Sequence, residues 1–406
     1  MGALSIIICA LLAYSLLSRR LESLLVTGPI FFAGAGVAAA LSDFVRVPGG
    51  PEMYEPFMEI SEVGLVLLLF ADASRTELGL LRRIGSLPTR LLSVGLLLTI
   101  LLGAVAAKVV FPELSIWEAG IIGAILAPTD AGLGQVIVNS PKVSEKIRQA
   151  LNVEAGLNDG LAVPFLLFFM TMALPAGTMR HSGLTMLIVE QLGYGAAVGV
   201  GIGLAGGWLL GLAHRREWMA EAMAPLGLMT LPLLCATASP AVNASMFIAA
   251  FVAGLVVQIG RADSGKHSIE LTEQWGQIFA LGVFFIFGFR FAVRWGEFGW
   301  RAVIYAAASL TVVRMLPVAI ALMGTKLDRA TVLFVGWFGP RGMASIVLGL
   351  VFLQEVEAAN SPHADAIRQA VMVTVMMSII AHGISAMPGI NLLARSGKAA
   401  QERPAI

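Results

Sequence analysis

The sequence has 406 residues, of which 57% are hydrophobic and only 13% are charged, and its formal net charge is +1. Soluble proteins carry about twice that fraction of charged residues, so the composition excludes an ordinary soluble enzyme and a basic domain that binds nucleic acid. The only two cysteines, Cys9 and Cys235, lie in apolar runs, which excludes a disulfide framework. The five histidines are scattered, mostly at expected loop positions, without the spacing of metal ligands. The composition therefore predicts an all-α polytopic membrane protein.

Apolar segments that could cross a bilayer recur along the whole chain. A spanning helix needs about 20 mainly apolar residues. The first segment lacks a basic start and a small-residue cleavage site, so we expect a helix there and not a signal peptide. No connection is long enough for a soluble domain, and we predict one transmembrane domain over 1–392 with a short tail over 393–406. About 13 transmembrane helices are expected, over residues 2–17, 24–42, 58–73, 87–111, 114–137, 146–174, 186–213, 219–238, 240–260, 270–292, 298–323, 329–353 and 366–388.

The distribution of basic residues predicts how the chain is oriented in the membrane. Of the 27 Lys and Arg, 18 fall in connections on one side, 7 fall on the other side, and 2 lie within spans. Lys and Arg are enriched in cytoplasmic loops. We therefore predict a multi-pass protein of the cell membrane with its N-terminus outside and its C-terminus in the cytoplasm.

Two of the expected spans are broken near their middles. Span 114–137 contains A-P-T-D-A-G-L-G around Pro128, and span 329–353 contains G-W-F-G-P-R-G around Pro340. Proline removes a backbone donor and disrupts a helix, and non-helical backbone at membrane depth is tolerated only inside protein or along a cavity. Paired broken helices in the two halves of a transporter point to its binding site, usually through inverted repeats. We expect such repeats and a binding site where the two breaks meet.

Three acids occur close to the first break. Asp130 lies in the break, and Glu154 and Asp159 lie in the next span, where Asp159 is near the middle. Charges at this depth are costly and mark ion or proton pathways. Glu154 and Asn158 are four residues apart and share a helix face. The stretch from the first break to Asp159 is therefore the candidate site.

The buried charges can be assigned partners, because an unpaired buried charge is unfavourable. The cations within the spans are Arg314 and Arg341. We expect Glu154 to pair with Arg341, which lies in the second break. Asp130 is expected to meet the exposed N–H groups of helix ends at the first break. Arg314 is a candidate support for the core, either beside Asp130 or near the inner end of the bundle, and Asp159 is left without a permanent cation.

An unpaired carboxylate in a dry site binds either a proton or a metal cation. Competition of this kind at Asp159 would couple opposite movements of H⁺ and a monovalent cation, and the neutral Asn158 beside it predicts one proton per cation. Oxygen ligands suit a hard cation such as Na⁺, and the candidates are Asp159 and Thr129, with Glu154 acting through water. Asp72, at the end of span 58–73, is expected to be an interfacial or vestibule residue. No cofactor is expected beyond the transported Na⁺ and H⁺.

Four motifs together resemble the sodium/proton antiporters of the NhaP and NHE type, within the monovalent cation:proton antiporter superfamily. They are F-A-D-A-S-R at 70–75, P-T-D at 128–130, L-N-V-E-A-G-L-N-D-G at 151–160 and G-P-R-G at 339–342. The resemblance implies that Asp159 carries the ion and the proton and that Asn158 marks an electroneutral exchanger. It also implies a bridge between Glu154 and Arg341 and a structural role for Asp130.

The same resemblance implies an NhaA-like fold and an assembly. Its two broken helices would cross within a core bundle over about 87–174 and 298–388. Scaffold helices over about 1–73 and 186–292 would form the interface of a homodimer. The sequence departs from the family in two places. Ala155 stands where the family commonly has Ser, and the first break reads T-D-A where many relatives have T-D-P.

The leading hypothesis is thus an electroneutral antiporter that exchanges Na⁺ or Li⁺ for H⁺, and not an enzyme. A K⁺/H⁺ antiporter on the same fold is the alternative. A symporter for an organic anion would need a larger central cavity and a second ion site. An intramembrane aspartyl protease with Asp130 and Asp159 as its dyad lacks the G-x-G-D context of that class. A channel is disfavoured, because one ionisable carboxylate at the midplane suits stepwise exchange.

Overall fold

The structure is a computed structural model that describes residues 3–23, 26–42, 54–75, 86–173, 189–260, 267–359 and 362–401. Within these ranges every regular element is a helix, and no strand occurs. Small parts of the predicted segments lie outside the described residues. These parts are residue 2, residues 24–25, 174 and 186–188, and residues 402–406 of the predicted tail.

In the first half of the chain, the helices follow the apolar segments. They are α1 (Ala3–Ser23), α2 (Gly28–Leu41), α3 (Tyr54–Arg75), α5 (Ser86–Arg90), a π-helical turn (Leu91–Gly95), α6 (Leu96–Val110), α7 (Ile116–Ile125), α8 (Ala131–Val138) and α9 (Glu145–Ala173).

The second half begins with a π-helical turn (Val189–Tyr194). Its helices are α11 (Gly195–Arg215), α12 (Ala224–Ala238), α13 (Met246–Gly260), α14 (His267–Val293), α15 (Trp300–Leu310), α16 (Val312–Ala321), α17 (Arg329–Trp337), α18 (Met343–Ala359) and α19 (Ala364–Gln401). Short 3₁₀ turns cover Glu221–Met223, Pro240–Val242 and Trp295–Glu297.

Each predicted span falls on one or more of these helices. Seven described helices are long and apolar enough to cross a membrane, and four shorter apolar helices accompany them. The chain is therefore a multi-pass membrane protein, while the number of 13 crossings stays a prediction. The last helix differs from the prediction, because α19 continues to Gln401 through residues assigned to the tail.

The two predicted breaks are present, and a third was missed. α7 and α8 are separated by Leu126–Asp130, and α17 and α18 by Phe338–Gly342. The third break is at Thr311, between α15 and α16, where a continuous span was expected. Pro317 follows inside α16 and removes a donor to the first turn of that helix, which favours a bend at its start.

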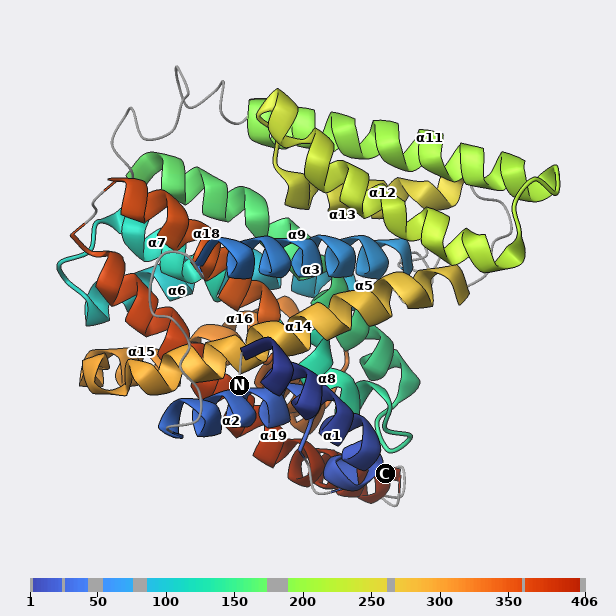
Figure 1. The fold of residues 1–406 in the computed structure, drawn as a ribbon. Coiled ribbons are helices and arrows are strands. Elements are labelled where there is room, and N and C mark those ends of the chain that lie inside the picture. Colours follow the sequence, from blue (N-terminus) through green and yellow to red (C-terminus); the bar gives the residue numbers. More distant parts are fainter. Residues whose placement is uncertain are drawn as a thin grey trace.

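The helices pack in two sets that meet around α9. α11 packs on α13, and α14 packs on α2 and α3, while α7 packs on α6 and α9, and α15 and α18 pack on α19. Figure 1 shows α11, α12 and α13 grouped on one side of the molecule. α9 also contacts α3 and α13 of the first set. The division into a core and a scaffold stays a prediction, and α9 lies where its two parts would meet.

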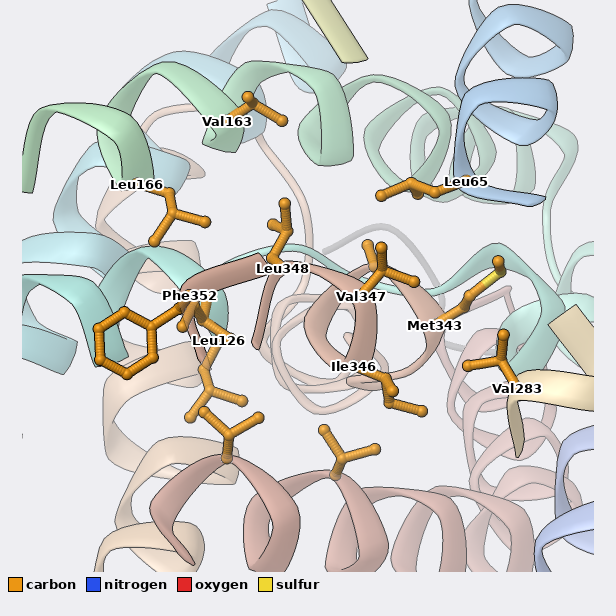
Figure 2. Packing of buried hydrophobic residues seen from close by; sticks show 14 of the residues in the cluster. Leu65, Leu126, Val163, Leu166, Val283, Met343, Ile346, Val347, Leu348 and Phe352 are labelled. Carbon is orange, nitrogen blue, oxygen red and sulfur yellow. The ribbon is translucent and has the colours of Figure 1, made fainter. Parts of the chain in front are cut away.

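Close backbone approach explains the tight α11–α13 pair. Gly195, Gly199, Gly203 and Gly207 recur every four residues on the buried face of α11. A Cβ at Gly199 would collide with the carbonyl oxygen of Ala249 in α13. Around α18 the packing depends on larger apolar side chains. Figure 2 shows Val347 and Leu348 pointing toward α9 and α3, with Ile346 pointing to the opposite side.

Candidate functional site

The two breaks are bonded to each other through the backbone. The N–H of Asp130 donates to the carbonyl oxygen of Pro340 at 2.7 Å. Nη1 of Arg341 donates to the carbonyl oxygens of Ala127 and Pro128 at 2.8 and 3.1 Å. Arg341 is fully buried. The carbonyl dipoles of the first break, just beyond the end of α7, thus direct partial negative charge at this guanidinium.

Asp130 accepts hydrogen bonds from the starts of two helices. Its Oδ1 accepts the N–H of Leu133 in the first turn of α8 at 3.0 Å, and its Oδ2 accepts the N–H of Met343 at the start of α18 at 2.7 Å. This is the arrangement expected when helix N-termini are exposed at a break. A Cβ at Gly342 would collide with the Asp130 carboxylate. Glycine is therefore required next to this double cap.

The predicted ion pair between Glu154 and Arg341 is wrong, because Glu154 pairs with Arg314. Oε1 of Glu154 lies 2.6 Å from Nη1 of Arg314, and both side chains are 3% exposed. The break at Thr311 starts a new helix, which places Arg314 in its first turn. Arg341 instead donates to the carbonyls of Ala127 and Pro128 in the first break. Arg314, expected only as a candidate support, is thus the partner that neutralises Glu154.

Thr129 and Asn158 are brought together. Nδ2 of Asn158 donates to Oγ1 of Thr129 at 2.7 Å, and both residues are buried. Oδ1 of Asn158 is buried without a hydrogen-bond partner among the described residues. This bond attaches the first break to the middle of α9, and it leaves an amide oxygen available for a ligand.

The side-chain carboxylate of Asp159 has neither a hydrogen bond nor an ion pair with any described residue, and its Oδ1 is buried. The charges of Asp130 and Asp72 act on its carboxylate. Buried polar atoms normally have a partner, and carboxylate and amide oxygens are ligands of hard cations. Asp159 and Asn158 therefore present adjoining helix positions with unsatisfied oxygens. Their role as ion ligands stays a prediction.

Asp72 lies closer to the site than expected. A Cβ added to Gly156 would lie 3.2 Å from Cβ of Asp72. Gly156 is three residues before Asp159 and shares its side of α9. Asp72 therefore belongs to the acidic cluster around Asp159. Its place at the end of an apolar segment pointed to an interfacial residue, whereas the small Gly156 was the signal that α3 approaches α9 here.

A narrow cavity lies beside the first break. It contacts Thr129, Asp130 and Ala155 and extends toward the end of α8 and the start of α9. The full lining is Thr129, Asp130, Gly134, Ile137, Val138, Leu151, Ala155, Phe338 and Pro340. The cavity thus lies between the meeting breaks and the end of α8, on the side whose connection between α8 and α9 the basic residues predict to be cytoplasmic.

One histidine that was assigned no role contacts the second break. His382 lies inside α19, is 2% exposed, and has Nε2 2.9 Å from the carbonyl oxygen of Trp337 at the second break. Its neighbours in sequence are small or apolar, so nothing in the local sequence indicated a contact with a distant break.

Comparisons with known proteins find relatives over most of the chain. A family model described as sodium/hydrogen exchanger, transmembrane, matches residues 6–390. A Na(+)/H(+) antiporter of Schizosaccharomyces pombe is 27% identical over 311 residues, covering 69% of this chain and 65% of that protein. The K(+)/H(+) antiporter NhaP2 of Shewanella sp. (strain MR-4) is 24% identical over 349 residues, covering 83% of this chain and 58% of that protein. The matches thus span about three fifths of these relatives.

A solved structure supports the fold. The sodium proton antiporter MjNhaP1 from Methanocaldococcus jannaschii at pH 8 superposes with a TM-score of 0.73 at 19% identity, covering 94% of this chain and 98% of that one. At this identity the likeness shows a shared fold.

Proposed function

The chain belongs to the sodium/hydrogen exchanger family, and we propose that it is a secondary antiporter that exchanges Na⁺ or Li⁺ for H⁺ across a membrane. One observation carries the proposal. Asp159 is a carboxylate inside a membrane helix, beside two meeting breaks, and has no hydrogen bond or ion pair with a described residue. A structural acid at this depth would be expected to have a partner, as Glu154 has in Arg314.

The exchange rests on competition for Asp159. A cation bound there is displaced by a proton, and a proton by a cation, so the two are carried in opposite directions. Oδ1 of Asn158 and Oγ1 of Thr129 supply further oxygens to the cation. Asn158 carries no charge, so one carboxylate titrates per cycle, and we propose an exchange of one H⁺ per cation without net charge movement.

Access to the site alternates between the two sides of the membrane. The cavity beside Thr129 and Ala155 supports access from the side that the basic residues predict to be cytoplasmic. We propose that the core helices over 87–174 and 298–388 move against the scaffold helices over 1–73 and 186–292. α9 packs on helices of both sets, which supports its place at this boundary. The homodimer and the orientation of the termini remain part of the proposal.

Reconstituted protein tests the function. Proteoliposomes that contain the protein and an internal pH dye should release H⁺ when external Na⁺ or Li⁺ is added, with or without a clamped membrane potential. Empty liposomes are the control for passive leak. If no monovalent cation moves protons between about pH 6 and pH 9, the proposed function is wrong.

A K⁺/H⁺ antiporter is the second candidate. Two observations favour it, namely the likeness to NhaP2 and the apolar Ala155 at the wall of the cavity. A site with fewer fixed oxygens dehydrates a small cation less well and is less selective for Na⁺. Exchange rates for Na⁺, Li⁺ and K⁺ measured on the same proteoliposomes distinguish the two.

A further inference from the structure

α19 holds the second break at both of its ends. α17 ends at Trp337, and the carbonyl oxygen of Trp337 lies 2.9 Å from Nε2 of His382. On the other side of the break, the N–H of Arg341 donates to Oγ of Ser378 at 2.6 Å. Ser378 and His382 are four residues apart on α19, so they share one face. Both are buried, at 0% and 2% exposure.

Ser378 and His382 also contact each other. The carbonyl of Trp337 is an acceptor only, so a hydrogen bond from His382 to Trp337 requires a proton on Nε2. Oγ of Ser378 accepts from Arg341 and lies 3.1 Å from Nδ1 of His382, and the carbonyl oxygen of Ser378 lies 2.9 Å from the same nitrogen. Nδ1 accepts from the hydroxyl when it is unprotonated and donates to the carbonyl oxygen when it is protonated. In both cases the two side chains connect the Arg341 N–H to the carbonyl of Trp337.

The second break, which Ser378 and His382 contact, also contacts the candidate ion site. Within the break, Pro340 accepts the N–H of Asp130, and Arg341 reaches the carbonyls of Ala127 and Pro128. Thr129, between these residues, accepts the hydrogen bond from Asn158. A shift of the second break would therefore move Thr129, a candidate ion ligand, and its hydrogen bond to Asn158.

We propose that Ser378 and His382 are positioning residues for ion binding, which set the second break and through it the oxygens of the first. They contact no ion themselves. This inference rests on the proposed exchange function. It predicts that loss of either side chain weakens cation binding in protein that is still folded, since the ligands remain present but are displaced.

Four variants test the inference in proteoliposomes. Ser378→Ala removes the acceptor for Arg341, His382→Asn loses the donor to Trp337, and His382→Gln keeps that donor but loses the partner of Ser378. Each should raise the apparent KM for the transported cation by about 3- to 10-fold, the effect of one lost hydrogen bond. The double variant Ser378→Ala/His382→Gln should be no worse than its worse single variant, because the members act as one chain.

The matched control is Thr374→Val. Thr374 is equally buried, lies one turn before Ser378 on α19, and bonds only to Ala370 of the same helix at 2.6 Å. Its apparent KM should match that of the unaltered protein. Cation-dependent thermal stabilisation is measured in parallel on purified folded protein, and nitrogen NMR of the His382 ring should show a proton on Nε2.

Two outcomes overturn the inference. One is a drop in yield or melting temperature for the Ser378 and His382 variants while the apparent KM stays at that of Thr374→Val, which means a structural role alone. The other is a ring protonated on Nδ1 only. If the unaltered protein exchanges no cation, the proposed function fails. The NMR measurement and the thermal stabilisation by cations then still test, separately, whether Ser378 and His382 position the second break.

Discussion

Glu154 and Arg314 form a buried ion pair with 2.6 Å between Oε1 and Nη1. Five residues farther along the same helix, Asp159 has no such partner among the described residues. One arginine thus places Glu154 and Asp159 in opposite electrostatic situations. The first is fixed by a permanent cation, and the second is available to a transported one.

Replacing the unpaired acid should abolish exchange and leave the fold intact. Asp159→Asn keeps the shape of the side chain but can no longer trade a proton for a cation. We expect transport to fall to the level of empty liposomes, with a melting temperature equal to or above that of the unaltered protein, since a buried charge is removed. Retained cation-driven proton release would refute the assigned role.

Competition at one carboxylate fixes the pH dependence. Protons and cations exclude each other, so the apparent KM for Na⁺ should rise as the pH falls. For a single competing proton, the apparent KM rises by at most about tenfold for each pH unit. A saturating Na⁺ concentration should restore the rate. Initial rates over a grid of pH values and Na⁺ concentrations measure this dependence. If log KM changed by about two for each pH unit, two protons would compete with the cation, which would contradict one-for-one exchange.

The partner of Glu154 can be identified by a double-mutant cycle. Arg314→Met leaves a buried carboxylate unpaired and should cost about 3–5 kcal/mol of stability. Glu154→Leu combined with Arg314→Met should recover much of that loss. The matched cycle pairs Glu154→Leu with Arg341→Met. Thermal unfolding in detergent gives both coupling energies, and a larger coupling with Arg341 would reverse the assignment.

The glycine beside Asp130 should tolerate no side chain. Gly342→Ala forces a methyl group into the carboxylate that caps α8 and α18. Overpacking costs about 1–3 kcal/mol, so we expect a lower melting temperature and loss of most exchange activity. Gly282→Ala in α14 meets no atom within 4 Å and is the control. Equal behaviour of the two variants would argue against the cap.

A hydroxyl at the cavity wall should favour the smaller cation. Ala155 lines the cavity beside Thr129, so Ala155→Ser adds an oxygen there. We expect the apparent KM for Na⁺ to fall by about fivefold relative to that for K⁺, the effect of one additional polar contact. Ala150→Ser, on the same helix and outside the cavity lining, is the control. An unchanged Na⁺/K⁺ ratio means that Ala155 does not set selectivity.

Local sequence predicted the features that depend on local chemistry. Pro128 and Pro340 locate the two breaks because proline removes a donor wherever it stands. The double cap on Asp130 follows from the same breaks, since exposed helix starts attract a carboxylate. The all-helical membrane fold follows from the length of the apolar segments.

Features that depend on helix packing were not predictable in the same way. Arg314 and Arg341 both lie more than 150 residues after Glu154, and charge counting cannot decide which of them reaches it. Two features of the packed structure decide it, namely the break at Thr311 that positions Arg314 and the carbonyls of the first break that bind Arg341. The approach of Asp72 to Gly156 and the contact of His382 with the second break were not predictable for the same reason, because each depends on a different helix that packs against the residue.

The double cap on Asp130 also constrains how the protein can move. α8 and α18 belong to opposite halves of the chain, yet both donate to one carboxylate. If the two broken helices slid past each other, that buried carboxylate would lose a donor, at a cost of about 1–3 kcal/mol. We therefore expect the two breaks to move together as one rigid body during transport. They should not open independently of each other.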